Sequence, residues 1–168
     1  SKADPTMHFN RVSTFPICAQ VGSSCESYTA TAAEIAAAST DGKTLIYTNS
    51  PKGEVGFVDI TDPALPQGLG ALAVGGEPTS VAVLGTHALV VVDTSTSFTS
   101  PKGKLVVIDI ATRRAVTEID LGGQPDSIAV SKDGAYAAIV IENQRDEGVN
   151  GGAIPQLPGG SLKIVDTT

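Results

Sequence analysis

The residue types best suited to chemistry gather in one polar stretch, residues 142–152. It holds the carboxylates Glu142, Asp146 and Glu147, several amide side chains and a single arginine, Arg145. Calcium and other hard cations take about six to eight oxygen ligands from such groups. The alternating spacing of an EF-hand is absent. Three interpretations stay open: calcium ligation, a solvated loop in which Arg145 pairs with a neighbouring carboxylate, and substrate contact through the planar fork of Arg145.

Two further acidic residues, Glu34 and Asp126, occupy equivalent places in an internal repeat. Each lies at the start of a segment predicted as an inner strand, and Pro125 restricts the backbone before Asp126. Acidic side chains at these positions face the region where the inner strands converge. They are therefore candidate metal ligands, and the alternative is that each carboxylate caps the entry to its strand.

The repeat is clearest in residues 75–83 and 122–130, which read Gly-Gly-Glu-Pro-Thr-Ser-Val-Ala-Val and Gly-Gly-Gln-Pro-Asp-Ser-Ile-Ala-Val. A degenerate third copy begins near residue 33. A repeat of this length, built from short apolar strands, is typical of β-propeller blades. The sequence therefore predicts an all-β fold of about three blades, each made of four antiparallel strands. The predicted blades are residues 33–74, residues 75–121 and an incomplete third blade, residues 122–168.

Local signals support this organisation. The Asp-Gly pairs at 41–42 and 133–134 predict tight hairpins between the first and second strands of their blades. The alanine-rich run 30–38 could be read as a helix, but its register in the repeat predicts a strand over residues 34–38.

The middle of the predicted blades carries two more patterns. Residues 88–92 are apolar throughout, which predicts a strand covered on both faces by neighbouring blades. The third strands end in Asp59, Asp109 and Asp166. Because a catalytic centre needs one site rather than three, this repetition predicts that each carboxylate caps the turn that follows it.

Three blades do not close a propeller, which typically has about four to eight. We therefore expect the chain to belong to a larger closed ring, completed by the same polypeptide or by a second chain. Residues 1–32 are expected to be irregular and could supply a strand that closes the ring. Cys18 and Cys25 either form a local disulfide or remain free thiols. A disulfide, together with a start that resembles a mature protein after leader removal, predicts an extracytoplasmic protein.

Composition excludes several classes of function. The net charge of −7 argues against a nucleic-acid partner, because phosphate binding requires a basic face. No run approaches the roughly 20 apolar residues needed to span a bilayer. His8 and His87 are isolated, so a zinc site is not expected. The sequence contains no nucleophile elbow, phosphate-binding loop or dinucleotide fingerprint.

Several segments together resemble bacterial secreted proteins known as the "esterase-like activity of phytase" family. The most specific part is Glu-Asn-Gln-Arg-Asp-Glu at residues 142–147, followed by Ile-Pro-Gln-Leu-Pro at 154–158. The other similar segments are residues 9–12, 47–51 and 122–130. The resemblance covers most of the chain.

This resemblance implies a longer, extracytoplasmic, calcium-dependent propeller that hydrolyses phosphoesters or other esters. In the related β-propeller phytases, acidic side chains around the channel hold calcium ions that bind phosphate and activate water. The matching positions here are Glu142, Asp146, Glu147 and Asp126. The resemblance assigns no catalytic residue to this chain.

Two functional hypotheses follow. The first is metal-assisted ester or phosphoester hydrolysis at the channel mouth, with Arg145 as the anchor for an anionic substrate. The second is a non-catalytic extracellular or cell-surface scaffold in which calcium only rigidifies the acidic loops. A redox propeller that holds a quinone is disfavoured, because the chain has no tryptophan.

Overall fold

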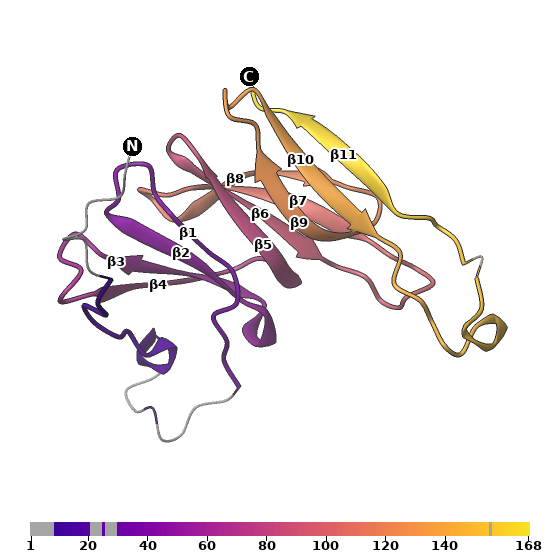
Figure 1. Ribbon diagram of the computed structural model, residues 1–168, viewed down its shortest axis with the longest axis horizontal. Helices are drawn as coiled ribbons and strands as arrows, with labels where there is room; N and C mark the ends of the chain where they lie inside the picture. Colours follow the sequence, from indigo (N-terminus) through magenta and orange to yellow (C-terminus); the bar gives the residue numbers. More distant parts are fainter. Residues whose placement is uncertain (1–8, 21–24, 26–29, 155) are drawn as a thin grey trace.

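The chain forms three antiparallel sheets that stand side by side (Figure 1). A computed structural model describes residues 9–20, 25, 30–154 and 156–168. Within these residues every regular element is a β-strand or a short 3-10 turn. Sequence reasoning predicted an all-β chain of antiparallel propeller blades, and the structure confirms it. In the described part of the chain, no helix is long and apolar enough to cross a membrane.

The first sheet has four strands, hydrogen-bonded in chain order. They are β1 (Ala36–Ala38), β2 (Thr44–Asn49), β3 (Glu54–Asp59) and β4 (Gln67–Ala73). The alanine-rich run thus ends in a strand, as its repeat register predicted, although β1 starts two residues later than expected. Ser50–Lys52 form the 3-10 turn η2 between β2 and β3.

The second and third sheets repeat this arrangement. The second contains β5 (Glu77–Leu84), β6 (His87–Asp93), β7 (Gly103–Asp109) and β8 (Arg114–Asp120). The third contains β9 (Gln124–Val130), β10 (Tyr136–Glu142) and β11 (Ser161–Asp166). The 3-10 turn η3 (Asn150–Gly152) lies in the long connection between β10 and β11.

Side-chain alternation along β6 joins the three sheets into one body. Ala88, Val90 and Val92 pack toward the first sheet, where they meet Phe57 and its neighbours. Leu89 and Val91 point the other way and pack against the third sheet. Because successive strand residues face opposite sides of a sheet, a strand buried on both faces must be apolar throughout. The prediction that residues 88–92 form such a strand is confirmed.

The three repeated aspartates cap turns, as predicted. The Oδ1 atoms of Asp59, Asp109 and Asp166 accept hydrogen bonds from the backbone N–H groups of Thr61, Thr112 and Thr168, at 2.8, 2.8 and 2.9 Å. At Asp166 the Thr168 hydroxyl also donates, at 2.6 Å, and has the largest effect there. These hydrogen bonds favour the ionised carboxylate and hold the pKa of each aspartate below its usual value. All three are structural groups at the same end of their blades; Asp166 is exposed, and Asp59 and Asp109 are partly exposed.

The N-terminal segment packs against the first sheet. Its 3-10 turn η1 (Ile17–Gln20) contacts β4, and Gln20 donates a 2.6 Å hydrogen bond to the hydroxyl oxygen of Tyr47. Cys18 and Cys25 form a disulfide, which confirms the predicted pairing. Residues 9–20 form no strand. The rest of the predicted closing segment, residues 1–8, 21–24 and 26–29, lies outside the described residues.

Candidate functional site at the loop end of the blades

Gln124 organises the end of the third sheet that bears the long loops. It is the first residue of β9 and pairs with Glu142, the last residue of β10. Its Nε2 atom donates hydrogen bonds to Glu142 Oε1 at 2.9 Å and to Gln144 Oε1 at 3.0 Å. Only 8% of Gln124 is exposed. A nearly buried amide therefore fixes the carboxylate of Glu142 and the start of the following loop.

The carboxylates around Gln124 come from two sheets. Asp93 ends β6, whereas Asp126 lies in β9. Partial burial raises the pKa of Glu142, and the negative charges of Asp126 and Asp93 raise it further. The sequence predicted Glu142 and Asp126 as site residues, and the charge of Asp126 is one of the causes that raise the pKa of Glu142. The charge of Asp93, which sequence reasoning did not name as a site residue, has the same effect.

A cleft of about 430 Å³ opens beside this cluster. Asp93, Gln124 and Asp146 line it, together with the serine- and threonine-rich loop after β6. That loop contributes Ser95, Thr96, Ser97 and Phe98. Ser95 is held in place because its N–H donates a 2.8 Å hydrogen bond to Asp93 Oδ1. The cleft therefore presents hydroxyl, amide and carboxylate oxygens from two neighbouring blades.

The long loop after β10 is organised by Gln156. The Oε1 atom of Gln156 accepts a 2.9 Å hydrogen bond from the backbone N–H of Asp146, and its Nε2 atom donates to the Asp146 carbonyl oxygen at 3.1 Å. Asn143 Nδ2 donates to the backbone carbonyl of Gln156. Gln156 belongs to the Ile-Pro-Gln-Leu-Pro segment, but its structural role could not be read from the sequence. It holds the Asp146 backbone in the position from which its side chain reaches the cleft.

Arg145 and Glu147 lie on another side of this loop. With Gly151 and Gly152 they line a groove of about 600 Å³. Arg145 Nη1 donates a 2.9 Å hydrogen bond to the Gly152 carbonyl oxygen. Of the three interpretations of this stretch, the one that pairs Arg145 with a neighbouring carboxylate is not seen: the ion pair found among the described residues joins Lys104 and Glu118, at 3.1 Å. The guanidinium is used at least in part to hold the loop.

Glu34 serves the contact between the first two blades. Ser50 Oγ lies 2.7 Å from Glu34 Oε2 and 2.9 Å from the Pro78 carbonyl oxygen. One blade further on, Thr79 Oγ1 donates a 3.0 Å hydrogen bond to the Pro125 carbonyl oxygen, so both blade contacts are bridged by a hydroxyl. In the described ranges, no three His, Cys, Asp or Glu side chains are placed to hold a metal ion. The five predicted ligands therefore do not form a closed carboxylate site.

Comparison with known protein families assigns the chain to one of them. The model of the choice-of-anchor I domain matches residues 34–168, which include all three sheets and the cluster around Gln124. The chain belongs to the choice-of-anchor I domain family. The match supports a propeller family, as predicted, but not the phytase-like family that several segments resemble. No curated protein matches this choice-of-anchor I chain in sequence.

Several solved structures have a fold similar to that of this domain. The domain is similar to the hydrazine synthase of Kuenenia stuttgartiensis, with a TM-score of 0.62 and 20% identity, over 80% of this chain and 34% of that one. A functionally unknown protein from Desulfotomaculum acetoxidans gives a TM-score of 0.57 at 14% identity, over 80% and 39% of the two chains. The dihydro-heme d1 dehydrogenase NirN gives 0.54 at 15% identity, over 78% and 24%. The domain thus spans well under half of each neighbour, and these likenesses show its fold alone.

Proposed function

We propose that this choice-of-anchor I domain is part of an extracytoplasmic β-propeller whose loop end binds a calcium ion. The observation that carries the proposal is the Gln124 cluster, in which one buried amide fixes Glu142 beside Asp126 and Asp93. Such a cluster joins two blades and opens on a cleft lined by oxygen-bearing side chains. Closure of the ring by further blades, from the same polypeptide or another chain, belongs to this proposal.

The donor chemistry suits calcium, which prefers carboxylate, amide and carbonyl oxygens. Glu142, Asp126 and Asp93 would supply charge, and Asp146 would approach from the loop side of the cleft. Among the described residues, no three carboxylates are placed to hold a metal ion by themselves. Amide oxygens, backbone carbonyls and water would therefore complete the coordination. Glu147 and Glu34 have other neighbours and contribute least to this proposal.

Hydrolysis of esters or phosphoesters is the second candidate function. Its support is the groove beside Arg145 and Glu147, since a guanidinium at the edge of a loop can bind an anionic group. A bound calcium ion would supply neutralisation of substrate charge there. Binding ranks ahead of hydrolysis, because no general base paired with a nucleophile is evident at this end of the described blades.

The proposed extracytoplasmic location agrees with two features of the chain. The Cys18–Cys25 disulfide is of a kind that persists in oxidising compartments. The choice-of-anchor I family assignment fits the same location.

Chelation separates binding from hydrolysis. The experiment measures the Tm of the full-length protein and its hydrolysis of a generic phosphoester. Both are measured with added calcium and again with a calcium chelator. The binding proposal predicts a higher Tm with calcium and no calcium-dependent turnover. Turnover that disappears with the chelator while the fold survives would move hydrolysis to first place. An unchanged Tm together with no turnover would reject both.

A further inference from the structure

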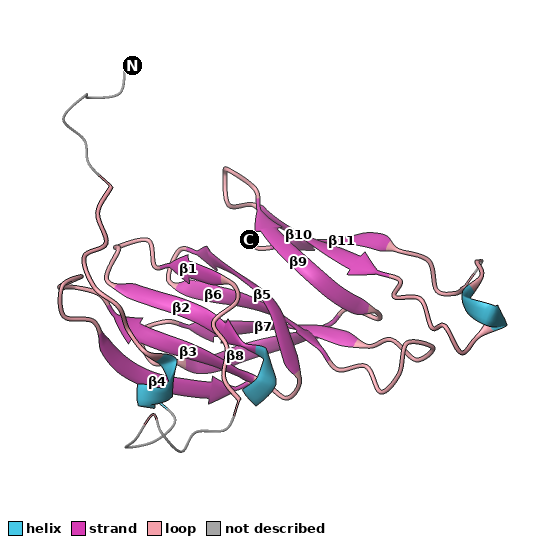
Figure 2. Ribbon diagram, turned by 60° about the horizontal axis from the view of Figure 1, so that its bottom comes forward, coloured by secondary structure: helices cyan, strands magenta, loops and turns pink. Residues whose placement is uncertain are grey.

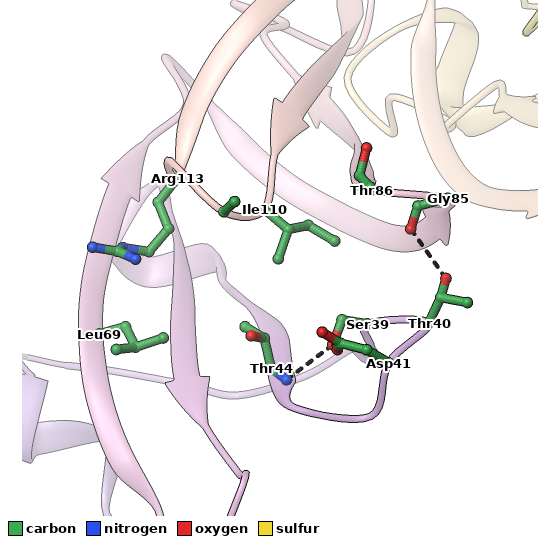
Figure 3. A pocket seen from close by; sticks show the side chains of 10 residues that line it. Ser39, Thr40, Asp41, Thr44, Leu69, Gly85, Thr86, Ile110 and Arg113 are labelled. Carbon is green, nitrogen blue, oxygen red and sulfur yellow. Dashed lines mark hydrogen bonds between the residues drawn. The ribbon is translucent and has the colours of Figure 1, made fainter.

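A second groove lies at the opposite end of the blades, between the first and second sheets (Figure 3). Its volume is about 520 Å³, within the roughly 300–1,000 Å³ typical of small-molecule sites. It is built from the turns that follow β1, β5 and β7, together with residues of β2 and β4. Both sheets are complete four-stranded blades, so the groove needs no residue from any other part of a ring.

The floor of this turn-end groove is apolar. Leu69 of β4 packs against the core between the first two sheets, and Ile110 belongs to that core and is 9% exposed. Figure 3 shows Ile110 near the middle of the groove, with Arg113 on one side and Thr86 and Gly85 on the other. A ligand that covered Leu69 and Ile110 would remove apolar surface from water, which is favourable.

Most polar groups on the rim already have partners within the protein. Asp41 Oδ1 accepts hydrogen bonds from Ser39 Oγ at 2.6 Å and from the Lys43 N–H at 3.0 Å. These bonds lower the pKa of Asp41 and keep it ionised in its own turn. Thr40 Oγ1 donates a 3.0 Å hydrogen bond to the Gly85 carbonyl oxygen and so ties the two turns together. These residues shape the groove and offer few additional bonds.

Arg113 differs from its neighbours on the rim. Its guanidinium makes no hydrogen bond or ion pair with any of the residues that the structure describes. Its backbone has φ +57°, a conformation uncommon for a residue other than glycine. The backbone N–H of Arg113 donates a 2.8 Å hydrogen bond to the Asp109 carbonyl oxygen, which fixes this conformation in the turn. The turn therefore presents an available, permanently charged fork beside an apolar floor.

We propose that the turn-end groove binds a small organic anion, with its apolar body on Leu69 and Ile110 and its carboxylate on Arg113. The planar guanidinium offers paired N–H donors in the geometry that a carboxylate accepts. The ligand is expected to be negatively charged, because Arg113 on the rim has no carboxylate partner among the described residues. This site is separate from the calcium proposal, since the two lie at opposite ends of the blades.

Hexanoate is a suitable probe, and 1-hexanol is its uncharged counterpart. Saturation-transfer NMR and equilibrium dialysis on the full-length protein would measure their binding to the native protein and to three variants. Arg113→Gly removes the guanidinium and suits a positive φ. Arg113→Gln keeps a side chain and serves if the glycine variant folds poorly. Arg114→Gln, at the next and exposed position, is the matched control.

The proposal predicts that hexanoate binds the native protein and the Arg114→Gln variant equally well. Loss of the charge-assisted bonds in the Arg113 variants is expected to weaken hexanoate binding about tenfold or more. Hexanol should bind all four proteins weakly and alike. Equal hexanoate affinity in the native and Arg113 variants, hexanol binding as tight as hexanoate binding, or no binding of either probe would each overturn the proposal.

Discussion

The two ends of the blades are built on different principles. At the turn end, an aspartate caps the turn after the third strand of every blade: Asp59, Asp109 and Asp166 each accept a hydrogen bond from a backbone N–H of the following turn. At the loop end the three connections differ in length and content, and only the third blade carries the polar stretch 142–152. Figure 2 shows this long connection extending away from the sheets. The repeated aspartates Asp59, Asp109 and Asp166 are structural, whereas the polar stretch 142–152 has no counterpart in the other two blades.

A second contrast concerns the faces of the outermost sheets. The first sheet carries residues 9–20 on its outer side, where Val12, Phe15 and Ile17 line a cavity with Leu45 and Val58. No segment among the described residues covers the outer side of the third sheet. Tyr136, Val140, Leu162 and Ile164 are 52%, 42%, 65% and 63% exposed there. A row of exposed apolar side chains on one sheet face is what a neighbouring blade would cover.

The largest loss of stability is expected from a mutation in the hydrophobic core between the first two sheets. Phe57 is fully buried between the first two sheets. Phe57→Ala should cost about 3–5 kcal/mol of unfolding free energy, because it removes the ring and leaves a cavity. Phe98→Ala on the loop after β6, where the ring is 45% exposed, is the matched control and should change stability by about 0.5 kcal/mol or less. Equal losses in chemical denaturation would mean that the blade core is misassigned.

Gln124→Ala tests whether the loop end is held by one amide. The change removes both hydrogen bonds of Nε2 and leaves Glu142 without its donor. We expect the free energy of unfolding to fall by about 1–3 kcal/mol, because the partly buried carboxylate of Glu142 loses its hydrogen-bond donor and alanine offers no replacement. Gln144→Ala removes only one of the two bonds at an exposed position and should cost less. If the two variants lose the same stability, Gln124 has no special organising role.

The two ends should also respond to pH with opposite signs. Asp109 has a lowered folded pKa, so its contribution to stability is present above its usual value of 3.8 and is lost as the pH falls through the lower folded value. Glu142 has a raised folded pKa, so its unfavourable contribution disappears as the pH falls from that raised value to its usual 4.5. Asp109→Asn should flatten the stability profile below pH 3.8, and Glu142→Gln should flatten it above 4.5. Denaturation curves across this range check both signs, and a Glu142→Gln profile identical to that of the native protein would contradict the electrostatic account of the cluster.

Much of the fold could be predicted from the sequence because the repeat encodes it. Alternation, turn residues and register fixed the blades, the strand at residues 88–92 and the role of the three aspartates. The start of the first blade was less accurate, since an alanine-rich strand has little side-chain pattern to mark its ends. The packing of residues 9–20 on the first sheet depends on contacts far apart in the chain and left no local signal.

The candidate site was only partly predictable. Glu142, Asp126 and Asp146 were named from residue type and position. Of these, Asp146 lines the cleft, and Glu142 accepts a hydrogen bond from Gln124, which also lines it. Gln124 and Asp93 were missed as site residues, because their importance comes from the pairing of β9 with β10 and from the approach of β6 in a neighbouring blade. Sequence reasoning did not single out Arg113, since a backbone conformation with positive φ cannot be recognised from an arginine in a sequence.

Calcium titration of matched variants from the two ends tests the central claim most directly. Isothermal titration calorimetry would compare the native full-length protein with Glu142→Gln and Asp126→Asn at the loop end, and with Asp109→Asn and Asp166→Asn at the turn end. The account predicts saturable calcium binding that the loop-end variants weaken about tenfold or more and that the turn-end variants leave unchanged. Calcium binding that is absent, or that falls equally in both pairs, would contradict the assignment of calcium binding to the loop end.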